Sequence, residues 1–362
     1  MLARSAYLTW AAQRYGRLRF DLAVSGMPAP PAEVLGQPPT EARPDPAEWL
    51  ALRAAMARYN GVPEEACVAA LGTTQAVWLA CEALTSPGDE ILVEAPGYEP
   101  LTRIAESVGA VVRTFDRPSR RGFALDAERV AGAMTPRTKL VVVSDPHNPS
   151  GVRAGGKVLR AVAGAVAARG ARLLVDEVYA PFDGFVDARG VLRGGAAGEV
   201  PGILCAGSLG KAYGLGHARV GWLTGPAEDI ARARDVILTT AGSLPLAHAR
   251  EGLRALERIG SLADWARGRL GNKRERVARW VAEQGLRWSE PPGGLFGFVH
   301  LPGPGDVTQL VDRELREREV LVAPGAFFGE PGGFRLAWSA DDAILDEGLT
   351  RLGDALRSWL PR

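Results

Sequence analysis

A lysine lies beside a potential anion site in the segment Ser208–Lys211, which reads Ser-Leu-Gly-Lys and is followed eight residues later by Arg219. A lysine amine can condense with an aldehyde to give a Schiff base, while a hydroxyl and a guanidinium suit a phosphate. A ligand carrying both an aldehyde and a phosphate would therefore satisfy this segment. Because Ser-x-x-Lys also occurs in acylating serine enzymes and on solvated loops, the segment needs support from the rest of the chain.

Three apolar runs end in polar residues, and each run is typical of a buried strand followed by a turn. In an open α/β sheet, ligands bind outside the carboxyl ends of the strands, so the turns can converge on one crevice. Taken singly, an Asp at a strand end is more often a cap, and Asn-Pro is a common turn starter. The runs and the polar residues that follow them are Leu140–Val143 with Asn148, Arg172–Val175 with Asp176, and Gly202–Gly207 with Ser208.

A further anion site is predicted upstream, where the short apolar run Val68–Leu71 leads through Gly72 into the helical pattern Ala76–Leu84. A helix N-terminus with free N–H groups and hydroxyls attracts anions. Thr73 or Thr74 could instead be a simple N-cap, and both roles can hold together.

The chain at this point resembles the class I/II aminotransferases of the aspartate aminotransferase superfamily. The resemblance depends on Asn-Pro-x-Gly at 148–151, Asp-x-x-Tyr at 176–179, and Ser-x-x-Lys at 208–211 with Arg219 eight residues on, in that order. It spans most of the chain, from Ser25–Pro28 to Gly333–Leu336. It implies pyridoxal 5'-phosphate as the cofactor.

The resemblance also implies a role for each matched residue. Lys211 would hold the cofactor as a Schiff base and carry a proton between the substrate's Cα and the cofactor. Asp176 would pair with the pyridine nitrogen and keep it protonated, which makes the ring an electron acceptor. The other expected cofactor contacts are Asn148 and Tyr179 at the phenolic oxygen, Tyr98 stacked on the ring, and Thr73, Thr74, Ser208 and Arg219 at the phosphate.

Substrate binding is expected near the C-terminus, where Arg335 lies in an alternating strand pattern. In the family an arginine at this place grips the substrate's α-carboxylate, and a planar guanidinium fits a planar carboxylate. Gly26 and Asn148 are expected beside it. Tyr7, Trp10 and Phe327 could line an aromatic side-chain pocket or pack a core, and core packing is favoured.

The pattern predicts an α/β fold. Strands alternate with helical segments, which indicates a large domain with a mostly parallel, seven-stranded type of sheet sandwiched by helices. A smaller α+β domain would come from the two chain ends. The expected boundaries are 45–245 for the large domain and 1–44 with 246–362 for the small one. Near the start, Tyr7, Leu8, Ala11 and Tyr15 form a helical stripe suited to packing on the small domain.

Composition limits the partners. The 362 residues carry a net charge of +1, which gives no general pull toward nucleic acid or membrane. The three cysteines and four histidines show neither a disulfide framework nor metal-ligand spacing. A basic, acid-free start leaves a transit peptide as an alternative to the favoured cytoplasmic location. A homodimer follows from the resemblance, although Gly36–Thr40 lacks the aromatic residue that many relatives lend to the neighbour's phosphate.

The leading hypothesis is an aminotransferase that moves an amino group between an α-amino acid and a 2-oxo acid in two half reactions through one site. Fold and motifs do not separate it from a β- or γ-lyase or a cyclising synthase that uses the same cofactor. A cofactor-binding sensor without catalysis is a remote third alternative, because the chain has no attached basic helix-turn-helix segment.

Overall fold

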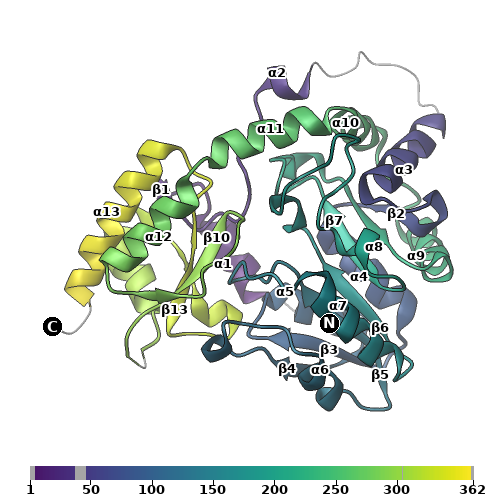
Figure 1. Cartoon of the computed structure of the whole chain (residues 1–362), viewed down its shortest axis with the longest axis horizontal. Helices are drawn as coiled ribbons and strands as arrows, with labels where there is room; N and C mark the ends of the chain where they lie inside the picture. Colours follow the sequence, from purple (N-terminus) through teal and green to yellow (C-terminus); the bar gives the residue numbers. More distant parts are fainter. Residues whose placement is uncertain (1–4, 37–45, 304, 360–362) are drawn as a thin grey trace.

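The computed structural model describes residues 5–36, 46–303 and 305–359. Figure 1 shows two lobes, with the elements from α3 to α9 in the larger one and α12, α13, β10 and β13 in the smaller one. Helix α11 bridges the lobes along one side, and α1 lies between them. The helices are α1 (Ala6–Arg14), α2 (Ala32–Leu35), α3 (Pro46–Asn60), α4 (Thr73–Leu84), α5 (Glu99–Ser107), α6 (Ala127–Ala133), α7 (Gly155–Ala167), α8 (Ala196–Glu199), α9 (Ala227–Thr240), α10 (Leu246–Glu257), α11 (Ile259–Leu270), α12 (Lys273–Glu283) and α13 (Asp342–Trp359).

The larger lobe is built on a seven-stranded sheet with the order β2-β8-β7-β6-β5-β3-β4. Only β8 runs antiparallel to its neighbours, β2 and β7. The expected α/β class with a mostly parallel sheet is therefore confirmed. The strands are β2 (Cys67–Ala70), β3 (Glu90–Ala95), β4 (Val111–Asp116), β5 (Thr138–Ser144), β6 (Arg172–Asp176), β7 (Leu204–Ser208) and β8 (Gly221–Thr224).

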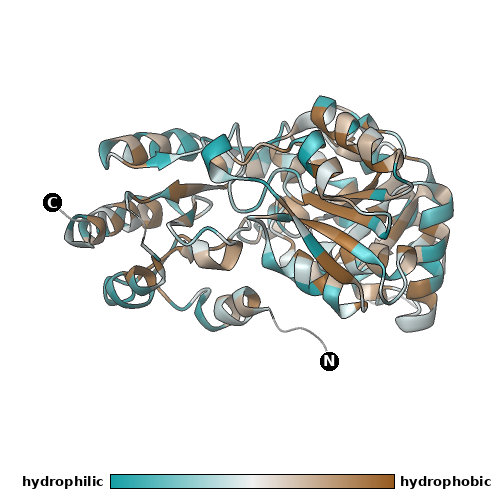
Figure 2. Cartoon of the chain, turned by 90° about the horizontal axis from the view of Figure 1, so that it is seen from below, coloured by the Kyte–Doolittle hydropathy of each residue, from teal (hydrophilic) through white to brown (hydrophobic). Residues whose placement is uncertain are grey.

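Helices cover both faces of this sheet, which explains why its strands are continuous apolar runs rather than alternating ones. Along β5, Leu140 and Val142 join a core with α4 and α9, while Val141 and Val143 join another with α7. The hydrophobic strands lie inside the helical layers in Figure 2. This burial fixes the strand ends, and therefore the turns that follow them, on a rigid base.

The smaller lobe has a four-stranded antiparallel sheet with the order β12-β13-β10-β9. Strand β1, near the start of the chain, pairs in parallel with β11, so the N-terminal region packs with the C-terminal elements. The strands are β1 (Phe20–Asp21), β9 (Arg287–Trp288), β10 (Phe296–His300), β11 (Val320–Leu321), β12 (Ala323–Pro324) and β13 (Gly333–Ala337).

The predicted stripe on the first helix is wrong at one position. Tyr7 and Ala11 are buried in the core of the smaller lobe together with Trp10, but Leu8 is 43% exposed. Because residues three or four apart share a helix face, Trp10 and not Leu8 completes the buried face. The preference for core packing of Tyr7 and Trp10 is confirmed, with Phe327 packed against the same core.

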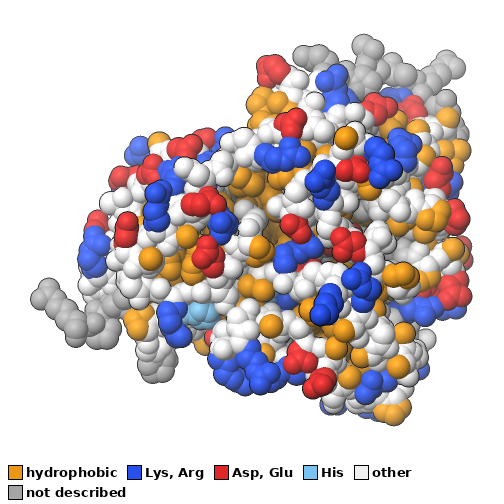
Figure 3. Space-filling model, viewed as in Figure 1, with side chains coloured by type: hydrophobic (Ala, Val, Ile, Leu, Met, Phe, Trp, Pro, Cys, Tyr) orange, Lys and Arg blue, Asp and Glu red, His pale blue; other side chains and the backbone are white. Residues whose placement is uncertain are grey.

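Charged side chains of both signs are interspersed over the face seen in Figure 3, in keeping with the small net charge. Among the described residues, no helix combines the length and apolar character that crossing a membrane requires.

Candidate active site

The turns at the carboxyl ends of β5, β6 and β7 meet at one cavity of about 240 Å³. This is the crevice that the strand pattern predicts, because parallel strands present their carboxyl ends at the same edge. Nine residues expected from the sequence line it together: Thr73, Thr74, Tyr98, Asn148, Asp176, Tyr179, Ser208, Lys211 and Arg219.

Lys211 follows β7 on a loop that is tied to the N-terminal region, since the Met27 N–H donates to the Lys211 carbonyl over 2.9 Å. A Cβ on Gly26 would lie 3.6 Å from Lys211 Cδ, so this glycine borders the lysine stem. Burial lowers the pKa of the Lys211 amine to about 8, helped by the positive charges of Arg335 and Arg219 and opposed by Asp176. A neutral amine is therefore accessible near physiological pH.

Asp176 ends β6 and is 8% exposed. Its Oδ1 accepts the Val178 N–H over 3.2 Å, which fixes the carboxylate at the strand end. Burial raises the pKa of Asp176 to about 7, with the nearby Glu94 adding to the shift, while the Val178 N–H and Lys211 oppose it. A positive group bound against Asp176 would relieve this strain.

The N-terminus of α4 forms the opposite end of the cavity. Gly72, with φ of 80°, is the N-cap and no side chain caps the helix, so the alternative that Thr73 or Thr74 is the N-cap is wrong. Thr73 Oγ1 is buried and has no hydrogen-bond partner in the part of the chain that the structure describes. Arg219 reaches this turn and donates to the Leu71 carbonyl over 3.0 Å. Free N–H groups, an unpaired hydroxyl and a guanidinium fit a phosphate.

Asn148 and Tyr179 stand on the strand-end side of the cavity. The Tyr179 hydroxyl donates to the Ser25 carbonyl over 3.2 Å. Asn148 Oδ1 accepts from Arg335 Nη1 over 2.8 Å, which leaves the amide Nδ2 without a hydrogen bond to the described residues. That donor can therefore serve a ligand oxygen. Tyr98 flanks the cavity, with its ring 5.6 Å from that of Tyr7 in an edge-on arrangement.

Arg335 lies in the centre of β13 and is completely buried. Besides Asn148, its guanidinium donates through Nη2 to the hydroxyls of Tyr7 (2.7 Å) and Tyr15 (3.2 Å) and to the Ala23 carbonyl (3.1 Å). Its Nε has no partner among the described residues. A buried guanidinium with an unused donor is a ready site for an anionic ligand.

The two tyrosines on Arg335 are not among the residues that the sequence predicts at the carboxylate site, because it places Tyr15 only in a packing stripe and Tyr7 in that stripe, in an aromatic pocket or in a core. A hydroxyl on a buried helix face needs a polar partner, and this requirement was the available signal. The segment Gly36–Thr40, where the sequence offers no aromatic residue for a neighbouring subunit's phosphate, lies mostly outside the described residues, which resume at 46.

Comparison with known proteins agrees with this geometry. A family model, aminotransferase class I and II, matches residues 35–352. The chain is 33% identical over 311 residues to capreomycidine synthase of Streptomyces vinaceus, covering 84% of this chain and 78% of that protein. It is 29% identical over 322 residues to the aspartate/prephenate aminotransferase of Thermus thermophilus, covering 86% and 82%. The crystal structure of a PLP-dependent aminotransferase from Streptococcus suis shares the fold, with a TM-score of 0.86, 22% identity and coverage of 100% and 99%.

The chain belongs to the class I and II aminotransferase family. It is an enzyme dependent on pyridoxal phosphate, like its relatives. The unpaired Thr73 hydroxyl, the Arg219 guanidinium and the Lys211 amine of lowered pKa fit this cofactor at its phosphate and aldehyde ends.

Proposed function

We propose that this enzyme transfers an amino group between an α-amino acid and a 2-oxo acid. The observation that carries the proposal is the buried Arg335, which donates to Asn148, a residue that lines the same cavity as Lys211. Both substrates carry a carboxylate at the same place relative to the reacting carbon. One guanidinium can therefore hold each of them in turn.

In this proposal, Lys211 would bind the aldehyde of the cofactor, and Asp176 would keep the cofactor's ring nitrogen protonated. Asn148 and Tyr179 would donate to the ring oxygen, and Tyr98 would pack on the ring. Thr73, Thr74, Ser208 and Arg219 would hold the phosphate at the start of α4. Pyridoxal phosphate, when bound, supplies an electron sink for negative charge at the substrate's Cα.

Lys211 has the second task of moving a proton. An amine with a pKa of about 8 is close to the range where general bases work best at neutral pH. Its Nζ would take the proton from the substrate's Cα and would deliver it to the carbon of the cofactor's aldehyde group. Arg335 would hold the carboxylate that is bonded to the substrate's Cα, and this would keep Cα within reach of Lys211 Nζ.

A cyclising synthase or lyase is the second candidate, and the relationship to capreomycidine synthase favours it. The same Lys211, Asp176 and Arg335 would bind the substrate and remove the Cα proton. The two reactions differ after the Cα proton has been removed. In the second candidate, a leaving group departs from the carbon next to Cα, and Lys211 does not return a proton. The site residues are common to both reactions.

A donor screen tests the proposal. Purified holoenzyme is incubated with single amino acids, each with pyruvate or 2-oxoglutarate, and the products are identified by mass spectrometry. Formation of alanine or glutamate supports transamination, whereas a cyclic product, or ammonia without use of the acceptor, supports the second candidate. Turnover of no amino acid despite bound cofactor would point to a sensor.

Lys211→Ala is the matched variant in this screen. Loss of the amine removes both the covalent attachment and the proton carrier, so we expect turnover to fall by at least about 10³-fold. The absorbance band of the lysine-bound cofactor should also disappear. A variant that keeps this band would show that another lysine holds the cofactor.

We also propose a homodimer in the cytoplasm, which the resemblance to aminotransferases supports. Sedimentation of the holoenzyme at micromolar concentration measures the first part, and a mass of one 38.4 kDa chain would contradict it. Fractionation of source cells measures the second part.

A further inference from the structure

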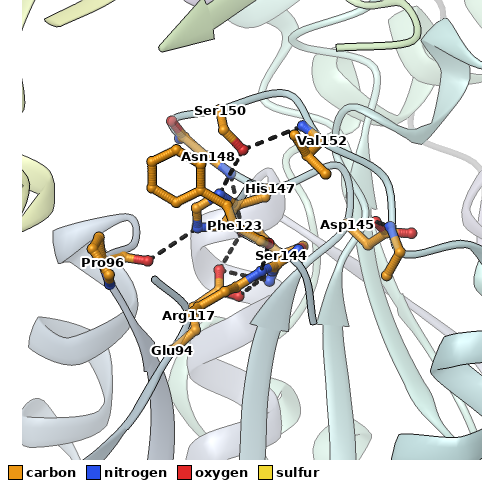
Figure 4. A network of polar contacts seen from close by, with 11 residues as sticks. Glu94, Pro96, Arg117, Phe123, Ser144, Asp145, His147, Asn148, Ser150 and Val152 are labelled. Atoms are coloured by element: carbon orange, nitrogen blue, oxygen red, sulfur yellow. Dashed lines mark hydrogen bonds and ion pairs between the residues drawn. The ribbon is translucent and has the colours of Figure 1, made fainter. Parts of the chain in front are cut away.

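A completely buried ion pair lies behind the active site, between the end of β3 and the residue that follows β4. Arg117 Nη1 is 2.5 Å from Glu94 Oε2, and both side chains are 0% exposed. Arg117 also donates from Nε to the Phe123 carbonyl over 2.7 Å and from Nη1 to the Ser144 carbonyl over 3.1 Å. Figure 4 shows this pair below the turn that carries Asn148.

Ser144, the last residue of β5, connects the pair to that turn. Glu94 Oε1 accepts from the Ser144 backbone N–H over 2.9 Å and also from the Ser144 hydroxyl. The hydroxyl oxygen in turn accepts the Asn148 N–H over 3.1 Å. Because the Ser144 hydroxyl donates to Glu94 and accepts from the Asn148 N–H, it has one defined orientation.

The chain of contacts continues to the substrate side, where Asn148 Oδ1 accepts from Arg335 Nη1. Five residues thus form a continuous path from the ion pair to the guanidinium: Arg117, Glu94, Ser144, Asn148 and Arg335. Each contact involves buried atoms, so water does not compete with it.

Stability alone does not account for this pair. Burying two charges costs desolvation that their attraction often fails to recover. In addition, Arg117 Nη2 has no hydrogen-bond partner among the residues described. The other end of β3 offers a comparison, since Glu90 pairs there with Arg137, whose side chain is 71% exposed. Of these two ion pairs, only Glu94–Arg117 has both side chains fully buried, and it is the pair behind the active site.

We propose that Glu94, Arg117 and Ser144 are positioning residues that hold Asn148 in the orientation in which it supports Arg335 for binding the substrate carboxylate. None of the three is among the described residues that line the cavity. The inference depends on the proposed function in one respect, the assignment of Arg335 as the carboxylate site.

Ser144→Ala tests the path without leaving a charge unpaired. Isovalerate is the probe, because it has a carboxylate and an apolar body but no amine that could react. Its dissociation constant for the holoenzyme is measured by calorimetry. We expect it to rise about fivefold or more, the effect of losing one buried hydrogen bond that orients a binding group. The KM for the amino acid should rise in parallel while kcat stays within about threefold.

Thr135→Ala is the matched control. The Thr135 hydroxyl also donates to a buried glutamate of β3, Glu90, but at the end far from the cavity. Both variants lose the same kind of contact and should lose similar thermal stability. Only Ser144→Ala should weaken isovalerate binding. Equal dissociation constants for Ser144→Ala, Thr135→Ala and the native enzyme would overturn the proposal.

Two further variants keep the result decisive. If Ser144→Ala fails to fold, Glu94→Leu combined with Arg117→Met removes the pair without leaving an isolated charge, and the same rise in the dissociation constant of isovalerate is expected.

Arg335→Lys separates this inference from the proposed function. Native affinity in Arg335→Lys overturns the carboxylate site and the inference with it. Lost affinity in Arg335→Lys with native affinity in Ser144→Ala overturns the inference alone.

Discussion

Asp176 and Lys211 are both held in surroundings that disfavour their charges. Burial is the largest cause in each case, and it brings the two pKa values to about 7 and about 8. The protein therefore keeps, at its active site, groups that cost stability until a ligand compensates them.

Asp176→Asn should consequently stabilise the cofactor-free protein while abolishing activity. The folded pKa of Asp176, about 7, lies above the ordinary aspartate value of 3.8, so native stability falls as pH rises between these values and stays low above pH 7. Asparagine keeps the acceptor for the Val178 N–H but carries no charge. We expect a gain of about 1–3 kcal/mol in unfolding free energy at pH 8, shrinking to nothing near pH 4.

Urea unfolding at pH 4.5 and pH 8 measures this gain. Asp187→Asn is the control, because hydrogen bonds from the Val191 and Arg189 N–H groups lower the pKa of Asp187 instead. That substitution should not stabilise the protein at either pH. A loss of stability in Asp176→Asn at pH 8 would contradict the argument from burial.

At the scale of elements, the start of α4 depends on a glycine. Gly72 has φ of 80° and ψ of 174°, a conformation almost restricted to glycine. A Cβ there would lie 2.7 Å from Arg219 Nη2. Gly72→Ala should thus displace the guanidinium as well as strain the turn, and we expect cofactor affinity to fall about tenfold or more.

Gly202→Ala provides the comparison for that measurement. Gly202 has nearly the same φ, 79°, but a Cβ there meets nothing within 4 Å. Both variants should lose about 1–3 kcal/mol of stability. Titration of the two apoproteins with pyridoxal phosphate, followed by fluorescence, should give a weaker cofactor affinity for Gly72→Ala than for Gly202→Ala. Equal cofactor affinities would show that Arg219 is not needed in its present place.

The elements that could be predicted from the sequence are those with a local signal. The strand before Asn148 is an apolar run that a Pro-rich turn ends, and such a pattern defines both the strand and its polar end. The role of Thr73 was harder to predict, because a hydroxyl suits a helix cap and a phosphate site equally well. The antiparallel β8 was not foreseen, because strand direction depends on pairing with β2 and β7 rather than on its own residues.

Long-range contacts explain most of what the sequence left open. Glu94 meets Arg117 across neighbouring strands, and Arg335 meets Tyr7 from the other end of the chain. An acid directly after the apolar residues Ile91–Val93 was a usable signal for a buried charge. Its partner could not be chosen among many arginines without the fold.

At the scale of the whole molecule, Arg335 joins parts that are distant in sequence. It belongs to β13 of the smaller lobe, yet it bonds Asn148 of the larger lobe and Tyr7 of α1. Figure 1 shows α1 between the lobes. Because Arg335 is fully buried, a carboxylate can reach it only after some of these contacts separate.

The mobility of α1 should therefore control substrate access, and Glu99 anchors the N-terminal end of this helix. Its carboxylate accepts the Ser5 hydroxyl (2.8 Å) and the backbone N–H groups of Ala6 (3.1 Å) and Tyr7 (2.7 Å) at the positive end of α1. Glu99→Gln removes the charge, and we expect docking of α1 to weaken by about 1–2 kcal/mol.

Such a loss would make the opened helix about 5–30 times more populated, so the backbone amides of residues 6–14 should exchange with deuterium correspondingly faster. Isovalerate should associate with the holoenzyme faster in stopped-flow measurements, since the open form is the one that admits it. Glu106→Gln is the control, because within the described part of the chain the Glu106 side chain pairs only with Arg103, on the same helix, α5. Faster exchange without faster association would mean that the carboxylate reaches Arg335 by another route, past Asn148 rather than past Tyr7.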